Sequence, residues 1–137
     1  MKRYVAMAAG CLLVGCVSAP KEAATLLGID WKLLEVDGKP ITTNPDQQPT
    51  LLLDSEGGHA AGSGGCNSYN AAFTQDETTL RLSPAMASKR GCAAEVNQLE
   101  MAFFQALSKV ASQRIDKGQL LLLDGEGKLL MRLGAKQ

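Results

Sequence analysis

The chain has 137 residues, 45% of them hydrophobic and only 4% aromatic, and its 14 basic and 14 acidic residues balance. Removal of a short leader leaves about 120 residues, which is the size of one domain with one core. Because no excess of positive charge is available to contact phosphates, the composition argues against a nucleic-acid partner.

The amino terminus has the pattern of a bacterial secretion signal. Lys2 and Arg3 precede an apolar run of about eleven residues, which is the length of a signal-peptide core but too short to span a bilayer, which needs about 20. The run ends in Leu13-Val14-Gly15-Cys16, which resembles the lipobox of bacterial lipoproteins. The resemblance implies that residues 1–15 are a lipoprotein signal peptide and that Cys16 carries diacylglycerol and a palmitate-like chain.

Two alternatives to this cleavage site are open. Cleavage before Cys11 would leave an apolar core of about seven residues, and an ordinary secreted protein cut after Ala19 would lose Cys16. Residues 16–28 are predicted to be a lipidated tether that reaches about 20 Å. In Gram-negative lipoproteins, an aspartate directly after the lipidated cysteine retains the protein at the inner membrane. Val17 occupies that position here, so this resemblance implies that the protein is anchored at the periplasmic face of the outer membrane.

After the tether the chain alternates short β-prone runs with turn residues. Asp37-Gly38 is a hairpin signal directly after the first run, and residues 42–49 are polar with two prolines, which is typical of a loop. The small residues of His59–Gly65 predict a kinked strand that continues through Cys66–Thr74. The other predicted strands are Trp31–Val36, Thr50–Leu53 and Thr79–Leu82.

One helix and a terminal meander complete the predicted domain. Apolar residues recur at three- and four-residue spacing from Ala93 to Ala111, which predicts a helix with its stripe in the core. Three strands are then expected at 114–116, 119–124 and 128–133. Leu120–Leu123 places leucine on both faces of its strand, so this strand should be central and covered on each side.

Two cysteines remain once Cys16 is lipidated. In an oxidising periplasm Cys66 and Cys92 are expected to form a disulfide bond that closes a loop of about 27 residues and contributes roughly 3 to 4 kcal/mol. The alternatives are a zinc site with His59 and a redox or nucleophilic thiol. Zinc usually needs four ligands and only one histidine is present, and a catalytic dithiol usually has CxxC spacing.

The most specific part of the domain is the glycine-rich approach to Cys66-Asn67-Ser68-Tyr69, followed by Ala85 to Cys92 and then by the helix with Glu100, Phe103 and Leu107. With these residues, the region from Trp31 to Leu133 resembles the META-domain, HslJ-type heat-shock lipoproteins of the bacterial envelope. Ser88 stands where the family usually has threonine, and Lys89-Arg90 where methionine is common. The resemblance implies a META-like domain at 29–134 with an α+β fold, in which an antiparallel sheet curls as a partial barrel around one long helix. It also implies an envelope stress response, no enzymatic activity, and a shape similar to secretin-pilot lipoproteins. The family motif comprises Gly62, Gly65, Cys66, Asn67, Tyr69, Ser88 and Cys92.

Two functions are compatible with these patterns. The first is a non-catalytic, membrane-anchored module that binds an envelope protein or protects against stress, acting as a monomer without metal or cofactor. The second is a carrier that binds a small hydrophobic ligand or lipid inside the curled sheet. Asn67 and Tyr69 are candidate contact residues, although Asn67 is also suited to a turn and Tyr69 to core packing.

Overall fold

The structure is a computed structural model that describes Gly15 and residues 25–56 and 58–136. The predicted signal peptide and Cys16 lie outside the described residues. Within those residues, no helix has the length and apolar character needed to cross a membrane.

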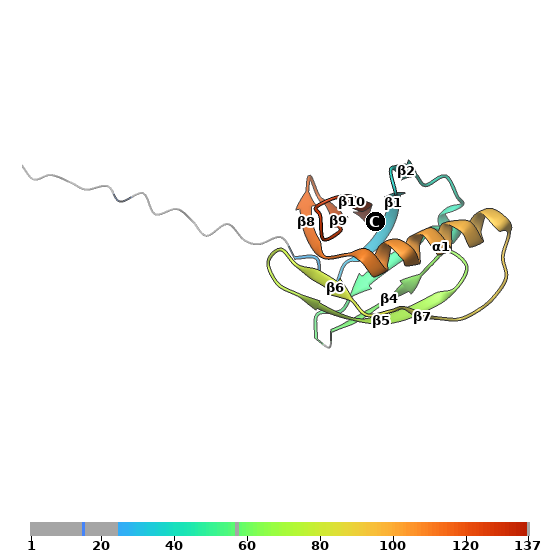
Figure 1. Ribbon diagram of the computed structural model, residues 1–137, viewed down its shortest axis with the longest axis horizontal. Helices are drawn as coiled ribbons and strands as arrows, with labels where there is room; N and C mark the ends of the chain where they lie inside the picture. The colour runs from blue at the N-terminus through green and yellow to red at the C-terminus, as the bar shows by residue number, and fades with distance from the viewer. Residues whose placement is uncertain (1–14, 16–24, 57, 137) are drawn as a thin grey trace, which may run out of the picture.

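The described chain folds into antiparallel strands and one α-helix (Figure 1). The strands occur in the order that the sequence pattern predicts, with boundaries that differ by a few residues. The elements are β1 (Asp30–Val36), β2 (Lys39–Pro40), the 3-10 turn η1 (Pro45–Gln47), β3 (Thr50–Leu53), β4 (His59–Ser63), β5 (Ser68–Gln75), β6 (Leu80–Leu82), β7 (Met86–Ala87), α1 (Ala94–Lys109), β8 (Ser112–Asp116), β9 (Gln119–Leu123) and β10 (Leu129–Ala135).

The sheet curls until its two ends meet. Its strand order is β6-β5-β4-β3-β1-β10-β9-β8, with β2 added beside β1 and β7 beside β5. The end strands are joined by a bridge between Thr79 and Ser112. The Leu80 N–H donates to the Ala111 carbonyl at 3.2 Å, and the Gln113 N–H donates to the Thr78 carbonyl at 2.9 Å. Closure of this kind removes most exposed strand edges, and the result is a nearly closed barrel.

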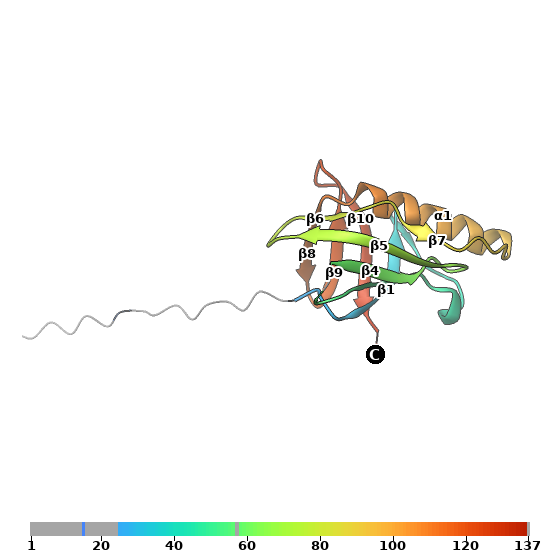
Figure 2. The same cartoon turned by 90° about the horizontal axis from the view of Figure 1, so that it is seen from below.

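The helix α1 covers the core of this barrel. It packs against β1, β6 and β10, and it lies along the curled sheet (Figure 2). Phe103, Ala106 and Leu107 of its apolar face join a core made largely of leucines from the strands. The predicted α+β fold, an antiparallel sheet curled around one helix, is therefore confirmed.

The first correction concerns the glycine-rich segment. A continuous kinked strand was expected through His59–Gly65 and Cys66–Thr74, but the chain reverses direction at Gly64–Asn67, and β4 and β5 pair as a hairpin. The Gly64 N–H donates to the Asn67 carbonyl at 2.8 Å. Gly65 has a φ of 115°, which other residues rarely adopt. The small side chains of β4 show no clear alternation, so no local pattern marks the point at which the chain reverses.

Other differences lie at the ends of elements. The strand β7 was not predicted because Met86–Ala87 is too short to show a pattern. Leu26 lies inside the predicted tether, yet it is buried, and its carbonyl accepts a hydrogen bond from the Trp31 indole at 2.9 Å. The packed part of the chain therefore begins before residue 29.

The strand β9 is central, as its leucines predict, because it pairs with β10 on one side and β8 on the other. Leu120 and Leu122 belong to the core. Leu121 points to the opposite face, where its cross-strand neighbours are Arg114 and Arg132. Arginine stems cover apolar neighbours while their charged ends stay in water, which is consistent with the burial of Leu121.

Candidate functional site

The turn between β4 and β5 is held against α1 by one carboxylate. Glu100 Oε2 accepts hydrogen bonds from the backbone N–H groups of Cys66 at 3.1 Å and Asn67 at 2.7 Å. Glu100 Oε1 accepts a third bond from Asn67 Nδ2 at 2.7 Å. Both Glu100 and Asn67 are buried. Hydrogen bonds to a carboxylate are stronger than those between neutral groups, so this contact fixes the turn to the helix.

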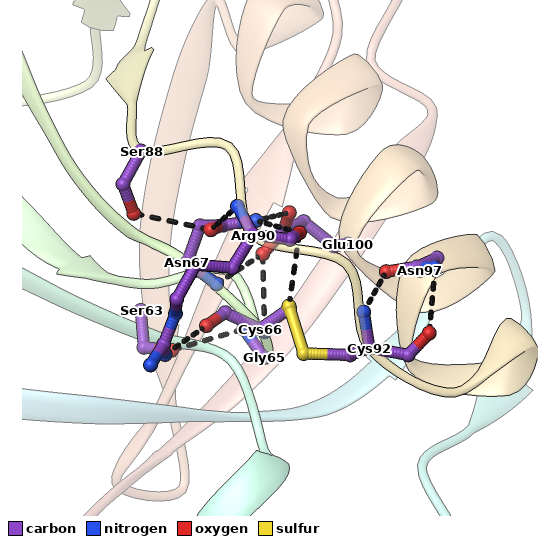
Figure 3. The surroundings of a disulfide bond; sticks show 9 residues. All are labelled: Ser63, Gly65, Cys66, Asn67, Ser88, Arg90, Cys92, Asn97 and Glu100. Carbon is purple, nitrogen blue, oxygen red and sulfur yellow. Dashed lines mark hydrogen bonds between the residues drawn. A yellow bond between two sulfur atoms is a disulfide. The ribbon is translucent and has the colours of Figure 1, made fainter.

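Asn67 also holds the segment that precedes α1. Its Oδ1 accepts hydrogen bonds from the Arg90 N–H at 2.6 Å and from Ser88 Oγ at 3.1 Å, and its Nδ2 donates to the Arg90 carbonyl at 3.2 Å (Figure 3). Both ends of the amide are therefore satisfied. One asparagine side chain thus connects the hairpin turn, residues 88–90 and the helix.

A covalent bond reinforces the same junction. Cys66 and Cys92 form a disulfide whose Cα atoms lie 6.0 Å apart. Arg90 Nη2 donates to the Cys66 carbonyl at 2.8 Å. Asn97 of α1 accepts from the Cys92 N–H at 3.2 Å and donates to its carbonyl at 2.9 Å. The predicted disulfide is present, and Cys66, Asn67, Ser88, Arg90, Cys92 and Glu100 are named here the junction cluster.

Glycine is required where the turn approaches its neighbours. A Cβ on Gly64 would lie 2.7 Å from Glu100 Oε2 and from a ring carbon of Phe104. A Cβ on Gly62 would collide with the backbone carbonyl of Thr50. Real side chains do not approach other atoms this closely, so these two glycines allow β4 to lie against β3 and the turn to lie against α1.

Tyr69 is a packing residue with one polar anchor. Its ring lies edge-on to Phe103 and Phe104, with centroids 5.7 Å and 5.4 Å away. Its hydroxyl donates to the Thr50 carbonyl at 2.8 Å. Burial, and secondarily the nearby charge of Asp30, raises the pKa of Tyr69 well above its usual range. Tyr69 therefore stays neutral and secures the hairpin.

The structure brings the family-motif residues together around this junction. Gly62 pairs with Tyr69 in the hairpin, Gly65 lies in its turn, and Ser88 contacts Asn67. Tyr69 packs in the core, which is one of the two roles that its sequence context allowed. The Asn67 side chain bonds to residues 88–90 and to Glu100, so its role extends beyond its own turn.

Sequence reasoning named Glu100 among the residues that carry the family resemblance but gave it no role, and it missed Arg90 and Asn97 as parts of this site. Glu100 had a detectable signal, because it lies on the apolar stripe of α1 between Val96 and Phe103. A charged residue is almost never buried unless it is paired. The partners of Arg90 are backbone carbonyls brought close only by folding, so no sequence pattern identifies them.

His59 takes no part in the junction cluster. It is exposed on β4, where it lies opposite Ala72. Within residues 25–56 and 58–136, no three His, Cys, Asp or Glu side chains gather as metal ligands would. The polar atoms of Asn67 and Glu100 are occupied by hydrogen bonds within the protein. The arrangement is suited to rigid support rather than to acid-base chemistry.

A groove of about 490 Å³ opens beside the junction cluster, between β7 and α1. Phe104 and Met101 contribute its apolar helix side, and Ala87 lies on the strand side. Lys89 is exposed on its rim. The junction cluster therefore forms one end of a surface that is open to solvent.

Comparisons with known proteins agree with this architecture. The META domain family matches residues 24–137. An NMR structure of a protein from Burkholderia xenovorans is similar at 20% identity, covering 88% of this chain and 98% of its own, with a TM-score of 0.62. A second NMR structure is similar at 21% identity, covering 76% and 86%, with a TM-score of 0.59. Among curated proteins no match was found.

Proposed function

This chain belongs to the META domain family, and from that premise we propose that it is a non-catalytic interaction module of the bacterial envelope, held at the membrane by a lipid on Cys16. The family supports an envelope or stress-related protein. The more specific role is carried by one observation: the polar groups of the junction cluster hold the protein's own segments together. We therefore assign the binding of a partner to the surface that this cluster supports.

The cluster has the properties of a scaffold. Glu100 accepts three hydrogen bonds, and the Asn67 amide is bonded at both ends. A general base or nucleophile needs a free acceptor facing a substrate, whereas these groups face other parts of the protein. Rigid support of a surface lowers the entropy lost when a partner binds, which suits an interaction module.

The packed interior favours this function over the lipid carrier. Leu33, Leu53, Phe103, Leu122 and Met131 meet inside the barrel with no exposed surface. A carrier of this size needs a cavity of about 300 to 1,000 Å³ that encloses its ligand. Side chains fill that position here, so a hydrophobic ligand would have to displace part of the core.

The lipid anchor sets where the module acts. Residues 17–25 separate the predicted lipid on Cys16 from the core residue Leu26, and nine residues can span at most about 30 Å. Lipoproteins carry more than one acyl chain, and two or more chains make membrane attachment stable. The domain is thereby confined close to the periplasmic face of the outer membrane, where a partner in the envelope is within reach.

In-cell crosslinking of the full-length lipidated protein, followed by mass spectrometry, tests this proposal. We expect a reproducible envelope protein among the products, and no shift of melting temperature when fatty acids are added to the purified protein. The opposite outcome would favour the lipid carrier over the interaction module. It consists of lipid that co-purifies with the domain, a rise in melting temperature on adding fatty acids, and no captured protein.

A further inference from the structure

Among the residues that the structure describes, the strand β7 pairs on one side only, with β5. It lies opposite β5 through Ala87 with Tyr69 and Met86 with Asn70, and the Ser88 N–H donates to the Ser68 carbonyl at 3.2 Å. In an antiparallel pair, alternate residues direct their N–H and C=O groups toward the partner strand. Because Ser88 bonds to β5, the backbone groups of Ala87 point away from β5, toward the groove.

The opposite wall of the groove is a face of α1. Asn97, Met101 and Phe104 lie along it at spacings of four and three residues, so they share one side of the helix. Met101 is 62% exposed and so offers apolar surface within the groove. Phe104 packs against the core at the base of the groove. An unpaired strand edge therefore faces an apolar helix surface.

We propose that this groove binds an extended, acidic segment of a partner protein, which adds to β7 as a further strand. The segment bonds to the outward backbone groups of Ala87. It places an apolar side chain on Met101 and Phe104 and a carboxylate beside Lys89. Strand addition of this kind obtains affinity from main-chain hydrogen bonds and specificity from alternate side chains. The inference rests on the proposed interaction function and names the class of its partner.

The charge of the groove identifies the occupant. Lys89 and Arg90 line it, and both residues are exposed. The acidic residue among its lining residues is Glu100, which is 8% exposed and has hydrogen bonds on both carboxylate oxygens. The rim is therefore positive. A second copy of this groove would offer the same positive rim and no free carboxylate, so it is not complementary to the first, whereas an acidic segment of a partner protein is.

The junction cluster keeps the edge in place for this partner. Residues 88–92 are fixed to β5 by the bond from the Ser88 N–H to the Ser68 carbonyl, and to the turn by Asn67 and the Cys66–Cys92 disulfide. A short strand bonded on one side alone would otherwise fray. The junction cluster thus holds the free edge of β7 in the position that strand addition requires.

A random octapeptide library displayed on phage, selected against the full-length lipidated protein in detergent, tests the proposal. We expect enrichment of peptides in which apolar or β-branched residues alternate with residues of other types, and which also contain Asp or Glu. Enrichment of helix-forming or basic sequences, or equal recovery on Met101→Asp protein, would overturn it. Equal enrichment on Gln105→Asp protein is expected, because exposed Gln105 is not among the residues that line the groove.

Variants then test the binding mode with one selected peptide. Ala87→Pro removes the outward N–H and leaves the Ser88 bond to β5 available, since proline is tolerated on the free side of an edge strand; we expect affinity to fall about tenfold or more. Lys89→Glu should reduce affinity about fivefold or more at low salt, an effect that salt diminishes. Arg81→Glu, an exposed change on β6 outside the groove, should have less effect. Unchanged affinity in both Ala87→Pro and Lys89→Glu would reject the proposal.

Photo-crosslinking in cells separates this inference from the proposed function. A benzoylphenylalanine at position 101 should capture an acidic segment of an envelope protein, and the same group at position 105 should not. Capture of a second copy or of lipid at position 101 would overturn the inference. If crosslinkers elsewhere on the domain capture a partner and position 101 does not, the interaction module stands and the groove is not its binding site.

Discussion

Glu100 shows how one buried charge organises a fold. Its carboxylate lies on the core-facing stripe of α1, where an unpaired charge would be strongly destabilising. Two backbone N–H groups and the Asn67 amide satisfy it. These donors come from a turn that would otherwise leave its own N–H groups buried without partners. The carboxylate and the N–H groups of the turn therefore stabilise each other. Loss of either one leaves the other buried without its hydrogen-bond partners.

Glu100→Gln should destabilise the domain. The new amide can accept from the two backbone N–H groups with its oxygen, but its NH₂ group then faces the donating Nδ2 of Asn67. We expect a loss of about 2 kcal/mol in the free energy of unfolding, as for other buried hydrogen bonds to charged groups, measured by urea denaturation. Glu126→Gln, the same change in an exposed turn, should alter stability by less than about 0.5 kcal/mol. Equal effects of the two changes would contradict this role of Glu100.

Tyr69 should ionise only when the protein unfolds. In a chain that begins at Val17 it is the single tyrosine, since the other is Tyr4. Burial raises its pKa above the ordinary value of 10.0, so its neutral form contributes stability that is present below that pH and is lost as the pH rises beyond it. Absorbance of tyrosinate should therefore appear together with loss of the circular dichroism signal. Titration near pH 10.0 with the fold intact would disprove this; the urea-unfolded chain serves as the reference.

Among the elements, the junction of β4, β5 and α1 depends on a segment with little regular structure. Residues 88–93 carry no strand or helix of their own. They are fixed by Asn67, Arg90 and the disulfide instead. Cys66 is buried whereas Cys92 is exposed, so the bond joins the interior of the hairpin to a surface segment.

Reduction of the disulfide should lower the melting temperature of the domain. The sequence separation of 26 residues corresponds to roughly 3 to 4 kcal/mol in the chain-entropy model. The purified domain starting at Val17 should show no titratable thiol before reductant is added. A variant with both Cys66→Ala and Cys92→Ala should already melt lower, and reductant should not lower it further. Two titratable thiols in the untreated native domain would refute the bond.

At the scale of the whole molecule, closure of the barrel does not depend on the proposed attachment to the membrane. The strands β6 and β8 meet through main-chain hydrogen bonds and a bridge. Leucines from both halves of the sheet then fill the interior together with the stripe of α1. We therefore expect a closed and filled domain of this kind to stay folded without the proposed lipid on Cys16.

Cys16→Ala should release the protein from the membrane. The variant is expected to lose labelling by radioactive palmitate and to move from the membrane to the soluble fraction, because the acyl chains provide the attachment. The purified soluble domain should keep the melting temperature of the lipidated protein. Cys11→Ala is the matched control and should be labelled normally. Normal labelling of the Cys16→Ala protein would show that a different cysteine is used.

Sequence alone determined most of the elements and their order. The strands around Trp31–Val36 and Thr50–Leu53 and the helix stripe follow from local hydrophobic patterns, and the central position of Leu120–Leu123 follows from its unbroken run of leucines. The disulfide followed from counting cysteines, and the family resemblance supplied the curled sheet. These features are local in the chain or countable, so they do not depend on which segments meet in space.

The tertiary structure alone decided the reversal at Gly64–Asn67, the strand β7, and the roles of Glu100 and Arg90. The small residues of His59–Gly65 look like a kinked strand until β4 and β5 pair. A glutamate on the apolar stripe of a helix shows no partner in the sequence until its donors are known. The reason is common to both: hydrogen bonds between residues more than 20 positions apart are fixed by folding, and no local pattern records them.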